Sequence, residues 1–210
     1  MSTGERPAIP LPAPAPLFVV LTGPSGAGKD AVLDELRGQG TNRHFVITAT
    51  TRPARTTEAH GTHYHFFTAE KFLELRDAGQ FLETAEVYGN YYGVPRWEVA
   101  EPLAAGHDVL LRTDVQGATT LKRLIPDAIV IFISPASLDE LATRLVRRNS
   151  ETDESLARRL AAAGQECELI PTYDYVVVNR EGALERTVSA VEAIMIAERA
   201  RTHPRQIALP

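Results

Sequence analysis

Cysteine, lysine and long apolar runs are scarce or missing in this sequence of 210 residues. With Cys167 as its only cysteine, the chain can form neither an intrachain disulfide nor a cysteine-cluster metal site, and we expect a reducing, cytoplasmic location. No apolar stretch approaches the ~20 residues that cross a bilayer, so no membrane association is expected. The formal net charge of −5 provides no basic footprint, and we expect no nucleic-acid partner.

The length fits one globular domain, residues 17–200, that carries a small inserted lobe and is flanked by two tails. Residues 1–16 contain five prolines and no continuous apolar segment, which is typical of a flexible tail and not of a signal peptide. The helical apolar pattern stops near Ala200. Residues 201–210 are therefore predicted to be a loose C-terminal tail.

The most informative stretch is 17–36, where an apolar, strand-like run breaks into a glycine-rich turn and then into an amphipathic helix. The turn fits G-x-x-x-x-G-K, a phosphate-binding loop whose backbone N–H groups point into one concavity at a helix N-terminus. Only three of the 22 basic residues are lysines, so a lysine here is hard to ascribe to chance. We predict an ATP phosphate site, in which Lys29 reaches the β- and γ-phosphates, formed by Gly23, Pro24, Ser25, Gly26, Ala27, Gly28, Lys29 and Asp30.

Five short apolar runs alternate with helical patterns, which indicates an α/β fold with a five-stranded parallel sheet and helices on both faces. The runs are 17–22, 45–49, 109–113, 129–134 and 175–179. Helices are predicted after the capping box Ser137-Leu-Asp-Glu140, over about 152–169, and over 182–200. The segment 50–106 is far longer than an ordinary crossover, so it should be a lobe with its own short strands that binds a second substrate.

Polar residues of this segment indicate what the second substrate is. Arg52 and Arg55 offer planar forks that match a phosphate, and the hydroxyls of Tyr64 and Tyr92 can donate to the same oxygens. The Glu83 carboxylate can accept hydrogen bonds from a base edge with adjacent N–H donors, as guanine has. Each signal is weak when taken alone, because exposed arginines are ordinary surface residues.

Residues 17–199 resemble the guanylate kinases, and six motifs carry the resemblance. They are GPSGAGK at 23–29, T-T-R-P-x-R-x-x-E-x-x-G-x-x-Y-x-F at 50–66, G-x-F-L-E at 79–83, G-N-Y-Y-G at 89–93, D-V-Q-G at 114–117 and R-L-x-x-R at 144–148. The resemblance implies a P-loop NTPase core, residues 17–49 and 107–200, with a mixed-β GMP-binding lobe at 50–106 and a helical lid at about 144–160. It also implies the conversion of ATP and GMP to ADP and GDP with Mg²⁺, and we expect dGMP to be accepted.

The same resemblance implies roles for individual residues. It places Arg52, Arg55, Tyr64 and Tyr92 at the GMP phosphate, and Thr48, Glu83 and Asp114 at the guanine. Its catalytic residues fall on Lys29, Arg52, Arg144 and Arg159, and further ATP contacts fall on Arg148 and, near the adenine, on Asn179.

Three positions depart from the family pattern. Asp30 replaces a hydroxyl that touches Mg²⁺, Val94 replaces a Thr or Ser on the GMP side, and Arg112 replaces an acid two residues before Asp114. Two hypotheses follow. Asp30 and Arg112 form an ion pair, so that Mg²⁺ is held mainly by phosphates and water, or Asp30 binds Mg²⁺ directly.

Two other functions are compatible with parts of the sequence. Ribose 1,5-bisphosphate kinases share a G-K-D loop and a Y-Y-G-V segment, but Tyr64, Glu83 and Asp114 would have little use on a bare ribose phosphate. Catalytically inactive, peptide-binding relatives usually lose the loop lysine or the lid arginines, which are present here. His60, His63 and His65 lie close together, yet we interpret them as a solvated strand face and not as a metal site. The sequence does not indicate an oligomeric state.

Overall fold

A five-stranded parallel sheet forms the centre of the molecule. The computed structural model describes residues 15–39, 42–148 and 153–210. Most of the proline-rich segment 1–16, together with part of the lid, therefore lies outside the described residues. The strand order and the pairing confirm the predicted sheet: β2 (Arg43–Phe45), β7 (Asp108–Arg112), β1 (Phe18–Thr22), β8 (Ile129–Pro135) and β9 (Tyr175–Asn179).

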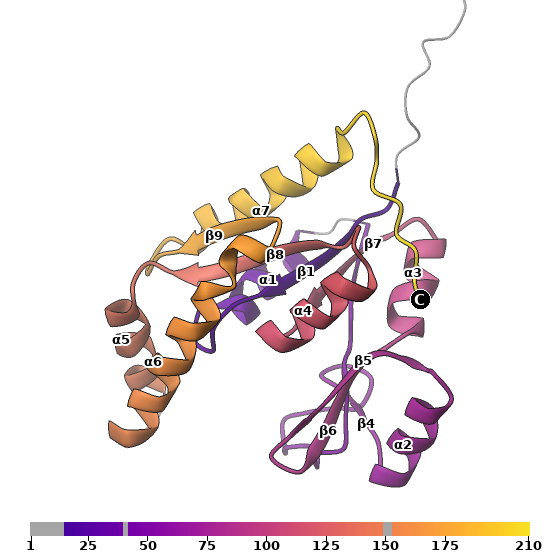
Figure 1. The fold of residues 1–210 in the computed structure, drawn as a ribbon, viewed down its shortest axis with the longest axis horizontal. Coiled ribbons are helices and arrows are strands. Elements are labelled where there is room, and N and C mark those ends of the chain that lie inside the picture. The colour runs from indigo at the N-terminus through magenta and orange to yellow at the C-terminus, as the bar shows by residue number, and fades with distance from the viewer. Residues whose placement is uncertain (1–14, 40–41, 149–152) are drawn as a thin grey trace, which may run out of the picture.

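Alternation along β1 divides the core into two layers. Phe18 and Val20 point to one face of the sheet and pack with α3 (Trp97–Ala104) and α4 (Val115–Leu124). Val19 and Leu21 point to the other face and pack with α1 (Lys29–Gly38) and α7 (Leu184–Arg199). Figure 1 shows α7 above the sheet and α4 below it. The sheet is thus buried on both faces, as continuous apolar strands require.

The inserted lobe is built on a second, mixed sheet with the strand order β4-β3-β6-β5. Its aromatic core stacks Phe72 on Phe81, with ring centroids 4.5 Å apart, and on Tyr91 at 5.6 Å. The predicted strand at 45–49 is wrong in extent, because the chain leaves the parallel sheet at Phe45 and enters the lobe sheet at Ala49. The elements of the lobe are β3 (Ala49–Thr50), β4 (His65–Phe66), α2 (Ala69–Asp77), β5 (Phe81–Val87) and β6 (Asn90–Pro95).

His65 on β4 also differs from its expected place on a solvated face. Its Nε2 lies 2.7 Å from Oε1 of Glu98 on α3, while His44 of β2 lies 2.7 Å from Oε2 of the same carboxylate. Burial alone would raise the pKa of Glu98, but hydrogen bonds from both imidazoles and from the Ile47 N–H lower it to about 2. This cluster ties the lobe to the core.

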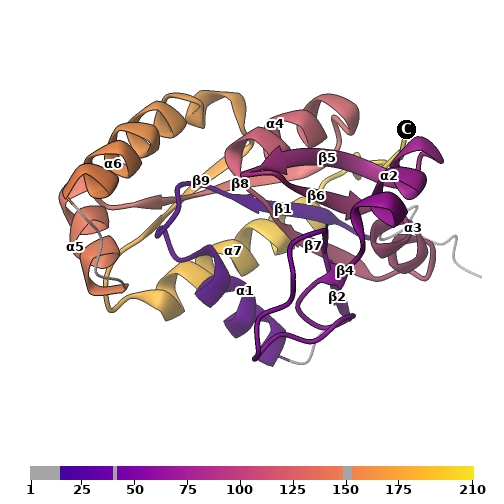
Figure 2. The same cartoon turned by 90° about the horizontal axis from the view of Figure 1, so that it is seen from below.

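Two antiparallel helices, α5 (Leu138–Arg148) and α6 (Asp153–Glu168), pack together at the far end of the sheet from α2 and α3 (Figure 2). The Ser137 hydroxyl caps α5 by accepting a hydrogen bond from the Glu140 N–H at 3.1 Å. The Glu140 side chain does not complete the predicted capping box, because it bonds Arg144 instead. A short 3₁₀ turn, η1 (Ile170–Thr172), leads from α6 into β9.

The C-terminal segment 201–210 is not loose as predicted. Arg205 is half-buried and donates hydrogen bonds to the buried Glu198 carboxylate at 2.8 Å and to Asp174 at 3.1 Å. Ile207 and Leu209 pack against the core layer below the sheet. Figure 1 shows this segment running back along α3. Among the described helices, none is both long and apolar enough to cross a bilayer.

Candidate active site

A cavity of about 380 Å³ lies at the carboxyl ends of β1 and β7, where the core, the lobe and α6 meet. This is the edge at which α/β sheets bind ligands, because loops and helix N-termini converge there. The core contributes the loop after β1 and the residues that end β7, and the lobe contributes the inward face of the β5–β6 hairpin. The lining includes these predicted site residues: Gly23, Ser25, Gly26, Gly28, Lys29, Asp30, Thr48, Tyr64, Glu83, Tyr92 and Asp114.

The glycine loop takes the conformation that the motif predicts. Gly23 has φ 131° and Gly28 has φ 95°, values in the left-handed region that side chains rarely adopt. A Cβ at Gly23 would collide with the carbonyl oxygen of Ile133, and one at Gly28 would collide with the Asn179 amide. These two positions must therefore be glycine for the loop to close onto the sheet.

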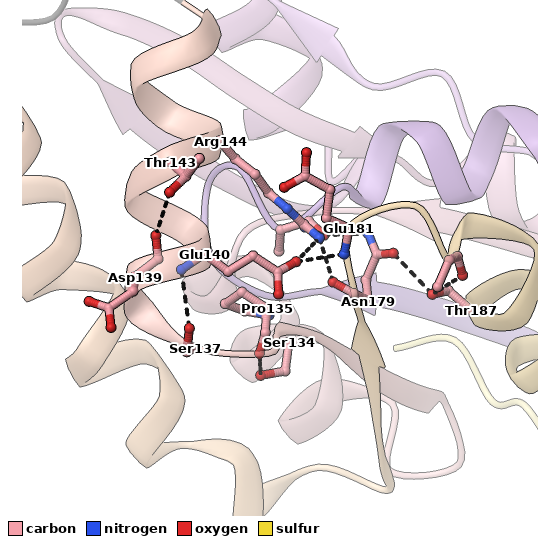
Figure 3. Close-up of polar contacts among 12 residues, drawn as sticks. Ser134, Pro135, Ser137, Asp139, Glu140, Thr143, Arg144, Asn179, Glu181 and Thr187 are labelled. Atoms are coloured by element: carbon pink, nitrogen blue, oxygen red, sulfur yellow. Dashed lines mark hydrogen bonds and ion pairs between the residues drawn. The ribbon is translucent and has the colours of Figure 1, made fainter.

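Asn179 lies behind this loop, in contact with Ala27 and next to Gly28. Its buried amide donates to the Ala27 carbonyl at 2.8 Å, and its side-chain oxygen accepts from the Thr187 hydroxyl at 3.0 Å (Figure 3). Both ends of the side chain are thus used within the protein. Asn179 therefore braces the loop, and its contact with ATP stays a prediction.

Arg144 is also turned toward the back of the loop. Its guanidinium donates to the backbone oxygens of Ala27 at 3.3 Å and Asn179 at 2.7 Å, and pairs with Glu140 (Figure 3). It is not among the residues that line the cavity in the described chain. Arg159 of α6 does reach the loop, where it donates to the Ser25 hydroxyl at 2.8 Å. The side chain of Arg148 lies outside the described residues.

Lys29 is the first residue of α1, and its side chain folds back over the glycine loop that precedes it. Its ammonium donates to the carbonyl oxygens of Gly23 and Pro24, the latter at 3.0 Å. Burial, followed by the positive charge of Arg112, lowers the pKa of Lys29 to about 8. A bound polyanion would restore its full charge, because the opposite charge favours the ammonium form.

Two carboxylates, one from β5 and one at the start of α4, meet in the cavity lining. Asp114 caps α4 by accepting a hydrogen bond from the Gly117 N–H at 2.8 Å, which fixes its side chain. A Cβ on Gly117 would lie 3.3 Å from Asp114 Oδ1 and 3.5 Å from Glu83 Oε2, so the two carboxylates converge beside this glycine. Burial, and then the negative charge of Asp114, raise the pKa of Glu83 to about 7.

The two predicted lobe arginines differ in how they are held. Arg52 makes a bidentate pair with Glu58, with both N–O distances at 2.9 Å, and its guanidinium carbon lies 5.4 Å from the centroid of the Tyr64 ring. Hydrogen bonds from Arg52 and from the Arg55 N–H lower the pKa of Glu58 to about 2. The Arg55 side chain itself is exposed, and within the described chain neither arginine lines the cavity.

Two charged residues that line the cavity are not among the predicted substrate contacts. Glu166 of α6 is half-buried and faces the loop, and burial raises its pKa. It follows Arg159 by seven residues, two helical turns, so shared-face periodicity could have indicated it. Arg112 is the other, and its Nε lies 2.9 Å from Asp30 Oδ1. The predicted ion pair between them is therefore present.

The described residues do not form a dedicated metal site. No group of three or more His, Cys, Asp or Glu side chains among them could hold an ion. Among the acids that line the cavity, Asp30 is paired with Arg112 and Asp114 caps a helix. A protein cage for Mg²⁺ does not fit this arrangement.

Comparison with known proteins shows the family that this chain resembles in sequence and in fold. The family model described as guanylate kinase matches residues 16–198. Guanylate kinase 2, chloroplastic/mitochondrial, of Oryza sativa subsp. japonica is 43% identical over 93% of this chain and 69% of its own length. The guanylate kinase of Syntrophomonas wolfei subsp. wolfei is 44% identical over 88% of this chain and 94% of its own. The crystal structure of guanylate kinase from Anaplasma phagocytophilum superposes with a TM-score of 0.72 at 33% identity, covering 90% and 89% of the two chains.

Proposed function

This chain belongs to the guanylate kinase family, and we propose that it transfers the terminal phosphoryl group of ATP to GMP, giving ADP and GDP. The observation that carries the proposal is that one cavity combines a site for phosphates with a pair of carboxylates. A phosphate-binding loop with Lys29 forms one part of its lining, and the converging carboxylates of Glu83 and Asp114 form another. Such a lining offers N–H donors and a cation to phosphates at the loop, and acceptors to a base at the carboxylates.

The carboxylate end recognises guanine. Guanine presents adjacent N–H donors on one edge, and the carboxyl oxygens of Glu83 and Asp114, with Thr48, offer the acceptors that this edge requires. Adenine offers a different set of donors and acceptors on that edge, so it would leave buried oxygens unpaired. We propose that dGMP is accepted as well.

The GMP phosphate is bound beside the lobe tyrosines. Tyr64 and Tyr92 line the cavity, and Arg52 stacks on Tyr64 with its geometry fixed by Glu58. The exposed Arg55 reaches the phosphate once the lobe moves toward it. Bidentate arginine contacts suit a phosphate because the planar fork matches two of its oxygens.

The loop end binds ATP. Backbone N–H groups of Gly23–Gly28 and the N-terminus of α1 receive its β- and γ-phosphates, and Lys29 neutralises them. Arg159 already contacts the loop and contributes charge at the transferring group, together with Arg148 from the lid. Arg144 acts by holding the loop, through Ala27 and Asn179.

Catalysis of this transfer is mainly positioning and charge neutralisation. Closure of α5 and α6 over the cavity excludes water that would otherwise hydrolyse ATP. Mg²⁺ supplies further neutralisation and arrives on ATP, held by phosphates and water instead of by a protein cage. The single cysteine fits the cytoplasmic location that we expect for such an enzyme.

The test is ADP formation by the purified chain with Mg-ATP and each of GMP, dGMP, AMP, UMP, CMP and ribose 1,5-bisphosphate. We expect turnover with GMP and dGMP and at least 100-fold lower kcat/KM with AMP, because the carboxylates reject the adenine edge. Glu83→Gln should remove most of the preference for GMP, whereas Glu86→Gln, an exposed change on the same strand, should leave it intact. Turnover only with ribose 1,5-bisphosphate, or with no acceptor, would overturn the proposal.

A further inference from the structure

The ion pair of Asp30 and Arg112 lies inside the cavity, where phosphate-binding loops of this type carry a hydroxyl side chain. Asp30 occupies the first turn of α1, directly after Lys29. Arg112 ends β7, and the register pairs it with Leu21 of β1, two residues before Gly23. Adjacent parallel strands therefore deliver the arginine to the mouth of the loop.

The pair leaves most of the Arg112 guanidinium available. Its Nε faces Asp30, and no hydrogen-bond partner for Nη1 or Nη2 occurs among the residues that the structure describes. The side chain is 35% exposed and lines the cavity. The two terminal nitrogens thus offer N–H donors to an anion in the fork geometry that a phosphate accepts.

The local charges indicate the same ligand. The positive charge of Arg112 contributes to the low pKa of Lys29, so two cations face one space. Like charges in a partly desolvated site are relieved when an anion binds between them. The ion pair is not explained by a contribution to folding stability. Asp30 is 61% exposed, and ion pairs that are this exposed stabilise the folded state little.

We propose that Arg112 binds the terminal phosphates of ATP beside Lys29, and that Asp30 positions Arg112 and does not bind Mg²⁺. The inference rests on the proposed function and deepens it. Arg112 supplies a fixed positive charge at the phosphates. In loops with a hydroxyl at position 30, the hydroxyl instead helps to hold Mg²⁺ there. Asp30 restrains the Nε side of the guanidinium, so that Nη1 and Nη2 point into the cavity.

The experiment is ATP binding by calorimetry, in EDTA and in Mg²⁺, for wild type, Arg112→Gln, Arg112→Lys, Asp30→Asn and the double variant Asp30→Asn/Arg112→Gln. Arg112→Gln should weaken ATP binding about tenfold in both buffers, because hydrogen bonds to a charged partner are lost. Arg112→Lys should recover part of the loss, as a point charge without a fork. Arg37→Gln is the matched control, since it removes the same charge from an exposed pair on α1.

The double variant tests the role of Asp30. If Asp30 acts through Arg112, Asp30→Asn weakens ATP binding several-fold in wild type and has no further effect in Arg112→Gln. A loss seen only with Mg²⁺, and equal in both backgrounds, would make Asp30 a metal ligand and overturn the proposal. ATP binding by Arg112→Gln within twofold of wild type would also overturn it. GMP turnover by wild type, measured in parallel, shows separately whether the proposed function holds.

Discussion

The Glu83 carboxylate should lower the free energy of unfolding when it is ionised, although the ionised form is the one that binds guanine. Burial raises its pKa from an ordinary 4.5 to about 7, which corresponds to a cost of about 3 kcal/mol for holding it ionised in the folded state. The folded protein keeps this proton longer than the unfolded chain does. Stability is therefore lost as pH rises from about 4.5 to 7, and the full cost persists above 7.

Glu83→Gln removes that cost. We expect the variant to unfold at a Tm roughly 6–12 °C above wild type at pH 8, and at a much more similar Tm at pH 5, where the wild-type carboxyl is protonated. Thermal denaturation by circular dichroism at the two pH values measures this, with Glu86→Gln as the control. An equal Tm difference at both pH values would refute the reasoning.

The same pKa sets the pH dependence of substrate binding. Only the ionised carboxylate accepts both guanine N–H groups, so the affinity of wild type for GMP should rise about tenfold from pH 6 to pH 8. Glu83→Gln should show only the change that comes from the GMP phosphate, which titrates near pH 6. Calorimetric titration of both proteins with GMP isolates the difference. A wild-type profile that parallels the variant would contradict the role of Glu83.

Three further changes test other parts of the structure. Asn179→Ala should lower the free energy of unfolding by about 1–3 kcal/mol in urea denaturation, because buried partners of its amide are left unsatisfied. Arg205→Ala should cost about 3–5 kcal/mol by the same measurement at pH 7, since the buried Glu198 carboxylate loses its hydrogen bonds from the guanidinium, and the cost should shrink as pH falls through the lowered pKa of Glu198. Lys29→Met should lower kcat by about 10²–10³-fold in steady-state assays and leave the KM for GMP within twofold, because its ammonium serves the transferring phosphates.

Local patterns were sufficient for much of the fold. The alternation of apolar runs with helical periodicity predicted the parallel sheet, and the glycine spacing predicted the loop at 23–29. The pairing of Asp30 with Arg112 was also predictable, because adjacent parallel strands bring their carboxyl ends together. Each of these predictions depends on residues close in sequence or on neighbouring strands.

Features set by long-range packing were not predictable in this way. Asn179 ends β9, two strands away from β1, and only the finished sheet shows that its amide reaches behind the loop. In the C-terminal segment, Arg205, Ile207 and Leu209 alternate with exposed residues. That run is too short to distinguish from a tail before its partners on the core are known. Nothing in the sequence around His65 indicated that its partner would be Glu98, a carboxylate 33 residues away on α3.

The most direct test of the account follows the phosphoryl group itself. The purified chain is incubated with Mg²⁺, GMP and ATP labelled in the γ-phosphate, and the products are separated by chromatography. We expect the label to appear in the β-phosphate of GDP in wild type, and at a far lower rate in Lys29→Met. Label released only as inorganic phosphate, or none transferred to GMP by a folded protein, would contradict it.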